Sequence, residues 1–273
     1  MRDAINKENP IPIFLASVNA NTIETNKYNT CTIAKVSGDK KFNLFFHSNF
    51  MRPYVIVNVA SSIDGKISNE QRVQLRISCE EDLKRVDELR ASVDAIMVGI
   101  GTILADNPKL NIKSEELRKK RTWNGLKPNP IKVIVDSKCR IPEDSEVLKE
   151  EAIVAVAKIA SKERIERISK KAEVVVFGEE KVDLKLLMEY LYKRGIRKLL
   201  VEGGGTLISS LISEALVDDV FIYFAPIFIG GSNSPTICDG RSFEKPVEME
   251  LVSIKKLGKG ILIHLKPKVP LSP

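Results

Sequence analysis

Four short apolar runs between residues 131 and 202 constrain the fold more than any other feature of the sequence. They are IKVIVD (131–136), AIVAVA (152–157), EVVVF (173–177) and KLLVE (198–202). The segments SKERIERISKK and DLKLLMEYLYKRG, which follow the second and third runs, carry apolar residues at helical spacing. Short apolar runs that alternate with helices are typical of a parallel sheet that is covered on both faces. We therefore expect an α/β fold with a mainly parallel central sheet.

Segments on either side of this alternation complete the expected sheet. Residues 53–60, PYVIVNVA, predict a strand, and the turn after it carries Asp64 and Gly65. The residues DGK describe a hairpin-like turn better than a catalytic acid, so we interpret Asp64 as structural. Near the end, DDVFIYFAPIFIGG and LVSIKKLGKGILIHLK read as strands with no helix between them. These terminal strands predict an antiparallel edge.

Helix boundaries are predicted from capping residues. Ser78 and Glu81 match a capping box, and Asp183 and Gly195 match the N-cap and C-terminal stop of a later helix. Three apolar residues fall on one face of the first of these helices: Leu83, Val86 and Leu89.

A third helical signal lies in the segment DAIMVGIGTILADNP. It predicts a strand, a turn at Gly99 to Gly101, and a short helix that ends before Pro108. The polar residues 113–129 after it are interpreted as an insertion without an assigned element.

Residues 1–50 differ in character from the rest of the chain. The stretch NANTIETNKYNTCT is polar, and no sustained apolar period accompanies it. We therefore predict an N-terminal extension of unknown structure over 1–50, one folded domain over 51–268, and a tail over 269–273. The extension is either a disordered accessory arm, a hairpin added at the sheet edge, or the product of a start codon upstream of a functional start at Met51.

Composition excludes several classes of function. The 273 residues carry 43 Lys and Arg against 36 Asp and Glu, a net charge of 43 − 36 = +7, but both signs are interleaved and aromatic residues make up only 6%. This pattern favours a solvated surface or a phosphorylated ligand over nucleic acid. Two histidines and four scattered cysteines argue against a metal site or a disulfide framework. No apolar stretch is long enough to span a membrane, so we expect a cytoplasmic protein.

The stretch LLVEGGGTLISSLI, residues 199–212, predicts a strand, a glycine turn and a helix. Glycines at a helix N-terminus leave backbone N–H groups open to an anion, so a phosphate-bearing ligand fits there. The alternative is a tight turn that lets the helix pack close to the strand. The spacing matches neither a dinucleotide fingerprint nor a P-loop.

Several motifs agree in identity, order and spacing with one known family. The chain resembles the reductase domain of riboflavin biosynthesis, a relative of dihydrofolate reductase, from Arg52 to about Lys268. The motifs are SSIDGKI, RIS, VDAIMVGIGTILADNPKLNI, VIVDSKCRIP, VEGGGTLISSLI, LVDDVFIYFAPIFIGG and LGKGILI.

The resemblance implies NADPH-dependent reduction of a ribosylaminopyrimidine 5′-phosphate to its ribitylamino counterpart, with NADH as the alternative cofactor. The zinc deaminase that precedes this domain in bifunctional bacterial members has no counterpart here, since its H-x-E and P-C-x-x-C signature is missing from the sequence. The chain is thus similar to the stand-alone archaeal and fungal type. Its expected substrate is 2,5-diamino-6-ribosylamino-4(3H)-pyrimidinone 5′-phosphate, the deaminated pyrimidine is the alternative, and homodimers are expected.

The same resemblance assigns cofactor-binding residues. It implies that the turn of Gly203, Gly204, Gly205 and Thr206 wraps the cofactor pyrophosphate. Further cofactor contacts are implied for Ala60, Arg76, Thr102, Asp106 and Val176. Two of these residues have an alternative role: Asp106 could cap the end of a helix, and Arg76 could form a surface ion pair. Lys158 and Lys162, near a strand end, are candidates for a 2′-phosphate site.

For the substrate, the resemblance implies that Glu202 accepts hydrogen bonds from the pyrimidine amino groups. Arg90 and Lys113 match positions that hold the ribose phosphate, and Gln74 and Leu110 match nearby positions. No sequence feature identifies a proton donor, so the catalytic residue stays unknown. Three other classes remain as alternatives: a dihydrofolate reductase proper, a non-catalytic nucleotide-binding module and a nucleic-acid binder.

Overall fold

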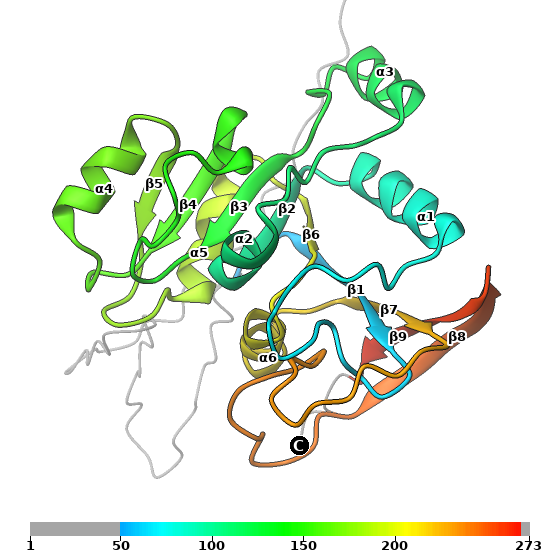
Figure 1. Cartoon of the computed structure of the whole chain (residues 1–273). Helices are drawn as coiled ribbons and strands as arrows, with labels where there is room; N and C mark the ends of the chain where they lie inside the picture. The colour runs from blue at the N-terminus through cyan, green and yellow to red at the C-terminus, as the bar shows by residue number, and fades with distance from the viewer. Residues whose placement is uncertain (1–49, 269–273) are drawn as a thin grey trace, which may run out of the picture. The chain divides into compact units, whose positions relative to one another are not determined.

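The computed structural model describes residues 50–268, in which nine strands form one sheet (Figure 1). The strand order is β5-β4-β3-β2-β6-β1-β7-β9-β8; the strands from β5 to β7 are parallel, and β9 and β8 are antiparallel. The strands are β1 (Tyr54–Ser62), β2 (Ala95–Gly99), β3 (Ile131–Val135), β4 (Ala152–Val156), β5 (Glu173–Val176), β6 (Lys198–Val201), β7 (Asp219–Ala225), β8 (Met249–Leu257) and β9 (Gly260–Pro267).

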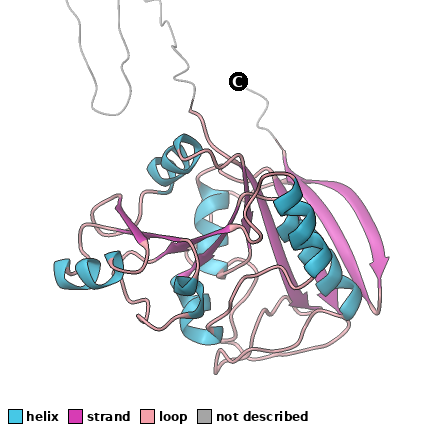
Figure 2. Cartoon of the chain, turned by 90° about the horizontal axis from the view of Figure 1, so that it is seen from above, coloured by secondary structure: helices cyan, strands magenta, loops and turns pink. Residues whose placement is uncertain are grey.

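Helices cover both faces of the sheet (Figure 2). They are α1 (Glu80–Ala91), α2 (Ile100–Asp106), α3 (Glu115–Trp123), α4 (Lys162–Ser169), α5 (Leu184–Lys193) and α6 (Gly205–Ser213), with a short 3-10 turn, η1, at Glu146–Lys149. The expected fold class is confirmed in each of its parts: a mainly parallel sheet, helices on both faces and antiparallel C-terminal strands.

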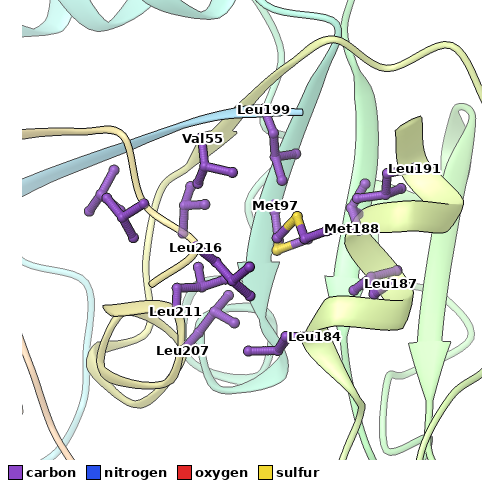
Figure 3. Packing of buried hydrophobic residues seen from close by; sticks show 14 of the residues in the cluster. Val55, Met97, Leu184, Leu187, Met188, Leu191, Leu199, Leu207, Leu211 and Leu216 are labelled. Carbon is purple, nitrogen blue, oxygen red and sulfur yellow. The ribbon is translucent and has the colours of Figure 1, made fainter. Parts of the chain in front are cut away.

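Successive residues of the inner parallel strands contribute to two separate cores, as a pleated strand requires. On β2, Met97 faces α5 and α6, where it packs near Met188 and Leu211 (Figure 3). Its neighbour Ile96 faces the opposite core, together with Ile103 of α2. All five side chains are at most 2% exposed, so both faces of the sheet are dry at β2.

The strands predicted from apolar runs all form, and the predicted N-cap Asp183 accepts a hydrogen bond from the N–H of Leu186 at 3.0 Å. The capping box at Ser78 and Glu81 is wrong. Helix α1 begins at Glu80 with Cys79 as its N-cap, and the Ser78 hydroxyl instead donates to Asp82 at 2.6 Å.

The predicted apolar face of α1 is also only partly right. Leu83 is 36% exposed, whereas Asp82 and Asp87 are buried. Asp82 accepts from the Arg85 guanidinium at 2.7 and 2.9 Å, and Asp87 accepts from two backbone N–H groups of the chain that follows α2. Buried carboxylates with such partners take positions that a hydrophobic period assigns to apolar residues.

Two boundaries in the middle of the chain differ from expectation. The turn at Gly99 to Gly101 does not form, because α2 begins at Ile100 directly after β2. The polar insertion contains a helix, α3, whose N-cap Ser114 accepts from the N–H of Leu117 at 3.2 Å. This helix has little apolar surface and is anchored by Arg121, which donates to backbone carbonyls at 2.8 to 2.9 Å.

Apart from Phe50, the predictions for the extension and for the tail fall outside the described residues. Within residues 50–268, no helix has the length and apolar character needed to cross a membrane.

Candidate active site

A cleft of about 970 Å³ opens where β2, β3 and β6 end. Gly99 at the end of β2, Val135 at the end of β3 and Gly204 after β6 all line it. In open parallel sheets, ligands bind outside the carboxyl ends of the strands, and the cleft lies at that edge.

Two long loops form one wall of the cleft. Ile67, from the loop after β1, donates its N–H to the carbonyl of Pro235, from the loop after β7, at 2.9 Å. Asp64 joins the same two loops, since its carboxylate accepts from the N–H groups of Ile229 and Gly230 at 3.1 and 2.8 Å. Asp64 therefore has the structural role that its turn motif indicates.

The glycines after β6 allow close packing and also leave backbone N–H groups accessible to a ligand. Gly203 and Gly204 have φ angles of +137° and +82°, in the region that favours glycine, and Gly204 is the N-cap of α6. A Cβ on Gly205 would lie 2.3 Å from the carbonyl oxygen of Thr236, so no larger residue fits there. The first N–H groups of α6 have no intrahelical partner and face this turn. The tight-turn interpretation thus describes Gly205, and the ligand interpretation suits Gly204.

Helix α2 brings Thr102 and Asp106 into the cleft one turn apart, as their spacing predicts. The C-cap of α2 is Asn107, with φ +39°, and not Asp106. Burial raises the pKa of Asp106 above its ordinary value, and its carboxylate has no hydrogen-bond or ion-pair partner among residues 50–268. A partly buried acid without a partner in a cleft is typical of a ligand-binding position.

Glu202, directly after β6, is paired with Arg90 of α1. The guanidinium Nε and Nη2 atoms donate to the two carboxylate oxygens at 2.7 and 2.6 Å, and Nη1 donates to the carbonyl of Asn111 at 2.9 Å. Burial disfavours the charged guanidinium, but the charge and hydrogen bonds of Glu202 outweigh it and raise the pKa of Arg90. Residues assigned to the pyrimidine and to the phosphate thus contact each other.

The other candidate substrate residues occupy different surroundings. Gln74 lines the cleft, whereas the Lys113 side chain is exposed and its backbone N–H donates to Asp87 at 2.6 Å. Leu110 is 5% exposed, with φ +53°. A ligand would therefore meet the backbone at Leu110 more readily than its buried side chain.

Not every expected cofactor contact lies in the lining of the cleft. Thr102, Asp106, Gly204, Gly205 and Thr206 line it. The lining does not include Ala60, Arg76, Val176 or Gly203, nor the substrate candidates Arg90, Leu110, Lys113 and Glu202. Arg76 is an exposed residue whose guanidinium lies 3.4 Å from Glu80, as the ion-pair alternative expects.

The loops after β3, β4 and β5 supply lining residues to which the sequence assigned no role: Ser137, Lys138, Arg140, Ile159 and Lys181. The motif VIVDSKCRIP contains the end of a predicted strand, so the rule for carboxyl ends of strands could have identified the first three. Lys158, a candidate for the 2′-phosphate, does not line the cleft and pairs with Glu179 at 2.6 Å. Lys162 is exposed at the start of α4 and is also outside the lining.

Comparison with known proteins identifies the family. The RibD C-terminal domain model matches residues 53–263. The chain belongs to this family. A protein of Archaeoglobus fulgidus named 2,5-diamino-6-ribosylamino-4(3H)-pyrimidinone 5′-phosphate reductase is 59% identical over 215 residues, which cover 78% of this chain and 97% of the relative.

A relative of the same name from Methanothermobacter thermautotrophicus is 41% identical over 223 residues, 80% of this chain and 100% of its own. Among solved structures, RibD of Acinetobacter baumannii superposes with a TM-score of 0.65 at 25% identity, over 80% of this chain and 59% of that longer protein. The resemblance inferred from the motifs is therefore confirmed at the level of family and fold.

Proposed function

We propose that this chain reduces the ribosyl group of 2,5-diamino-6-ribosylamino-4(3H)-pyrimidinone 5′-phosphate to the ribitylamino product, with NADPH as the reductant. The observation that carries the proposal is the 59% identity to a reductase of that name over 97% of its length. Similarity over the whole relative, and not over a fragment of it, supports a shared substrate.

The cleft fits a dinucleotide in size and in chemistry. Its volume of about 970 Å³ is at the upper end of ordinary ligand pockets. The glycine turn provides backbone N–H groups at the start of α6, which suit a pyrophosphate, and Thr206 adds a hydroxyl. Thr102 and Asp106 of α2 line the same cleft as the glycine turn, and they would contact a ribose or the nicotinamide amide of this ligand.

On the substrate side, Glu202 is the proposed acceptor for the pyrimidine amino groups, and Arg90 fixes its orientation. A guanidinium has five N–H donors, of which the contacts to Glu202 and Asn111 use three. Two donors therefore remain for the ribose phosphate, so the ion pair and the proposed phosphate contact are compatible. We assign Lys113, Gln74 and the backbone at Leu110 to the same ligand.

NADPH, when bound, supplies the hydride that adds to C1′ of the opened ribose. The residues of the chain hold the two ligands in register, exclude water from the cleft and balance the charge of two phosphorylated molecules. No side chain is proposed as the proton donor.

The test is a turnover assay with the purified full chain. Addition of the diaminopyrimidine ribotide should cause steady loss of NADPH absorbance, and mass spectrometry should detect a product that has gained two hydrogens. Parallel assays with the deaminated ribotide and with dihydrofolate separate the alternatives. Turnover of dihydrofolate alone, or of the deaminated ribotide alone, would contradict the proposed substrate, and NADPH binding without any turnover would leave a binding module.

We also propose a homodimer. Strand β8 is at the edge of the sheet and exposes Leu251, Val252 and Ile254 by 55%, 45% and 58%. An edge strand with exposed apolar side chains is a template for pairing with a second chain. Light scattering after size exclusion should give twice the chain mass for the native protein, and Ile254→Lys should shift it towards the monomer. A monomeric native protein would contradict this part of the proposal.

A further inference from the structure

The segment 110–113, which connects α2 to α3, is held against α1 by two side chains of that helix. Arg90 Nη1 donates to the carbonyl of Asn111 at 2.9 Å, and the Asp87 carboxylate accepts from the N–H of Lys113 at 2.6 Å. The first and last residues of the segment are both assigned above to the proposed substrate. The position of the segment therefore determines the geometry of the proposed substrate site.

The side chain of Glu150, shortly before β4, contacts the same segment through two asparagines. Its Oε1 accepts from Asn111 Nδ2 at 2.7 Å. Asn129 Nδ2 donates to the two carboxylate oxygens at 3.2 and 3.1 Å, and Asn129 Oδ1 accepts from the N–H of Ile112 at 2.9 Å. Asn111 Oδ1 is buried and has no hydrogen-bond partner among residues 50–268. Within that range, the bond to Glu150 alone orients the Asn111 side chain.

A buried lysine on β3, Lys132, supplies the counter-charge of Glu150. Its ammonium group donates to Glu150 Oε2 at 2.6 Å, and its side chain is 1% exposed. On the same face of the sheet, its neighbours Ile96 and Ile134 belong to an apolar core. Removing an ammonium group from water at such a position costs free energy, and the attraction within a buried ion pair often does not exceed that cost. The lysine is therefore a weak source of stability, which indicates another role.

The contacts form a continuous path from this lysine to the proposed substrate carboxylate. From Lys132 the path runs through Glu150 to the Asn111 side chain, with hydrogen bonds of 2.6 and 2.7 Å. It continues from the Asn111 carbonyl to Arg90, and from Arg90 to both oxygens of Glu202 at 2.7 and 2.6 Å. Among residues 50–268, no other cation lies within 4.0 Å of the Glu150 carboxylate. Loss of Lys132 would thus leave the start of the path without its counter-charge.

We infer that Lys132 and Glu150 are positioning residues for the substrate: they fix the segment 110–113, and through it the Arg90 guanidinium, in the geometry that binds the phosphorylated ribosylaminopyrimidine. The inference rests on the proposed function and deepens it, because it adds residues that set substrate affinity without touching the substrate. A segment that is already ordered binds its ligand without the cost of ordering it. Loss of this order should therefore raise KM more than it lowers kcat.

The test compares two double variants that differ in one side chain. Lys132→Met/Glu150→Gln removes both charges but keeps an amide oxygen that accepts from Asn111, whereas Lys132→Met/Glu150→Leu removes the acceptor as well. Neither variant leaves a buried charge unpaired, so both should melt close to the temperature of the native chain. The variant with Leu should raise KM for the ribotide at least about tenfold and change kcat less than about threefold, and the variant with Gln should keep KM within about threefold of native. The Kd for NADPH, measured by fluorescence titration, should be unchanged in both.

Hydrogen–deuterium exchange provides a readout that does not depend on turnover. In the variant with Leu, the amides of residues 110–113 should exchange faster than in the native chain, because Asn129 loses the carboxylate that holds it against Ile112. The variant with Gln should exchange at nearly the native rate. Lys149→Met is the matched control, since Lys149 is exposed and pairs with Glu146, and it should change neither exchange nor kinetics.

The inference is overturned if the two double variants have the same KM, or if their amides at 110–113 exchange equally fast. A rise in the Kd for NADPH that matches the rise in KM would also overturn it, since the damage would then be general. Asn111→Ala interrupts the same path without changing a charge, and an unchanged KM in that variant would have the same consequence. Absence of ribotide turnover by the native chain would instead contradict the proposed function itself, and this inference with it.

Discussion

The parallel strands begin at one edge of the sheet and end at the opposite edge, and these two edges differ in how their charged side chains are paired. At the amino ends of β1 and β7, Arg52 donates to both oxygens of Asp218 at 2.6 and 2.8 Å. Beside this pair, Asp219 accepts from Tyr54 and contacts His264 at 2.6 Å. Both aspartates are thus matched within the protein, and the hydrogen bonds from Tyr54 and His264 outweigh burial and lower the pKa of Asp219.

At the carboxyl ends, polar groups are left without protein partners. Asp106, Lys138 and Lys181 line the cleft with no carboxylate, ammonium or guanidinium partner among residues 50–268, and the N–H groups at the start of α6 face the same space. Charges that are matched internally stabilise the fold, whereas unmatched charges in a cleft are available to a ligand. Some charges at this edge are matched, as in the Lys158–Glu179 pair. The Arg90–Glu202 pair is also matched, and it is proposed to bind substrate.

The comparison is tested most strongly by breaking one ion pair at each edge. Arg90→Met leaves the Glu202 side chain, which is 8% exposed, without its counter-charge, and should lower the free energy of unfolding by about 3 kcal/mol. It should also raise KM for the ribotide, because Glu202 loses its orientation. Denaturant unfolding and steady-state kinetics measure the two effects.

Arg52→Met is the control at the amino ends. The side chains of Arg52 and Asp218 are 21% and 22% exposed, and Asp218 keeps a hydrogen bond from the N–H of Val55. We expect a loss of only about 1 kcal/mol and unchanged kinetics. Equal changes of KM in the two variants would show that the ion pair at Glu202 has no special role in the site.

The second prediction compares two glycines with nearly the same φ angle. Gly204 in the cleft and Gly195 after α5 have φ angles of +82° and +88°, and a Cβ on either meets no atom closer than 3.8 Å. Gly204→Ala and Gly195→Ala should therefore both cost about 1 kcal/mol of stability because of the positive φ angle. Gly204→Ala alone should weaken NADPH binding, measured by fluorescence titration, because its methyl group covers the N–H groups of the turn. A similar loss of cofactor affinity in Gly195→Ala would assign the effect to stability.

The sequence predicts the sheet well because its strands are buried on both faces. A strand such as Ala152–Val156 is apolar at every position, and no other element competes for that pattern. The helices were harder to predict wherever polar side chains carry the packing. The buried Asp87 on α1 and the buried Arg121 on α3 are satisfied by partners distant in sequence, which no local period encodes. The buried Asp82 is satisfied by the nearby Ser78 and Arg85, a polar contact that an apolar period does not predict either.

The candidate site shows the same contrast between residues that a local motif reveals and residues that only the folded chain brings together. The glycine turn and α2 could be located because each is a local motif, and both reach the cleft. The loops after β3 and β5 come together through the hydrogen bond between Ser137 and Val182, 45 residues apart. That Lys138 and Lys181 line one cleft therefore became visible only in the folded chain.

A smaller effect is expected at Asp106, whose unmatched charge should cost stability. Burial raises its pKa in the folded state, so the charged form is disfavoured there relative to the unfolded chain. Asp106→Asn should thus raise the melting temperature by a few degrees at neutral pH. The gain should disappear as the pH falls below the ordinary Asp value of about 3.9, where the native carboxyl is protonated in both states. Weaker NADPH binding should accompany the gain, and calorimetry over a pH series tests both.

The smallest effect is expected from removing residues 1–50. The family match begins at residue 53, and the sheet, both cores and every residue of the proposed site lie within 51–268. A chain that begins at Met51 keeps the ion pair between Arg52 and Asp218 as its first long-range contact. We expect it to fold, to dimerise and to retain full reductase activity, and limited proteolysis of the full chain should cut first before residue 52. The melting temperature, the mass by light scattering and kcat of the two chains should agree. If the shortened chain lost solubility or most of its activity, residues 1–50 would be part of the working domain, and the division into matched and unmatched edges would have to include them.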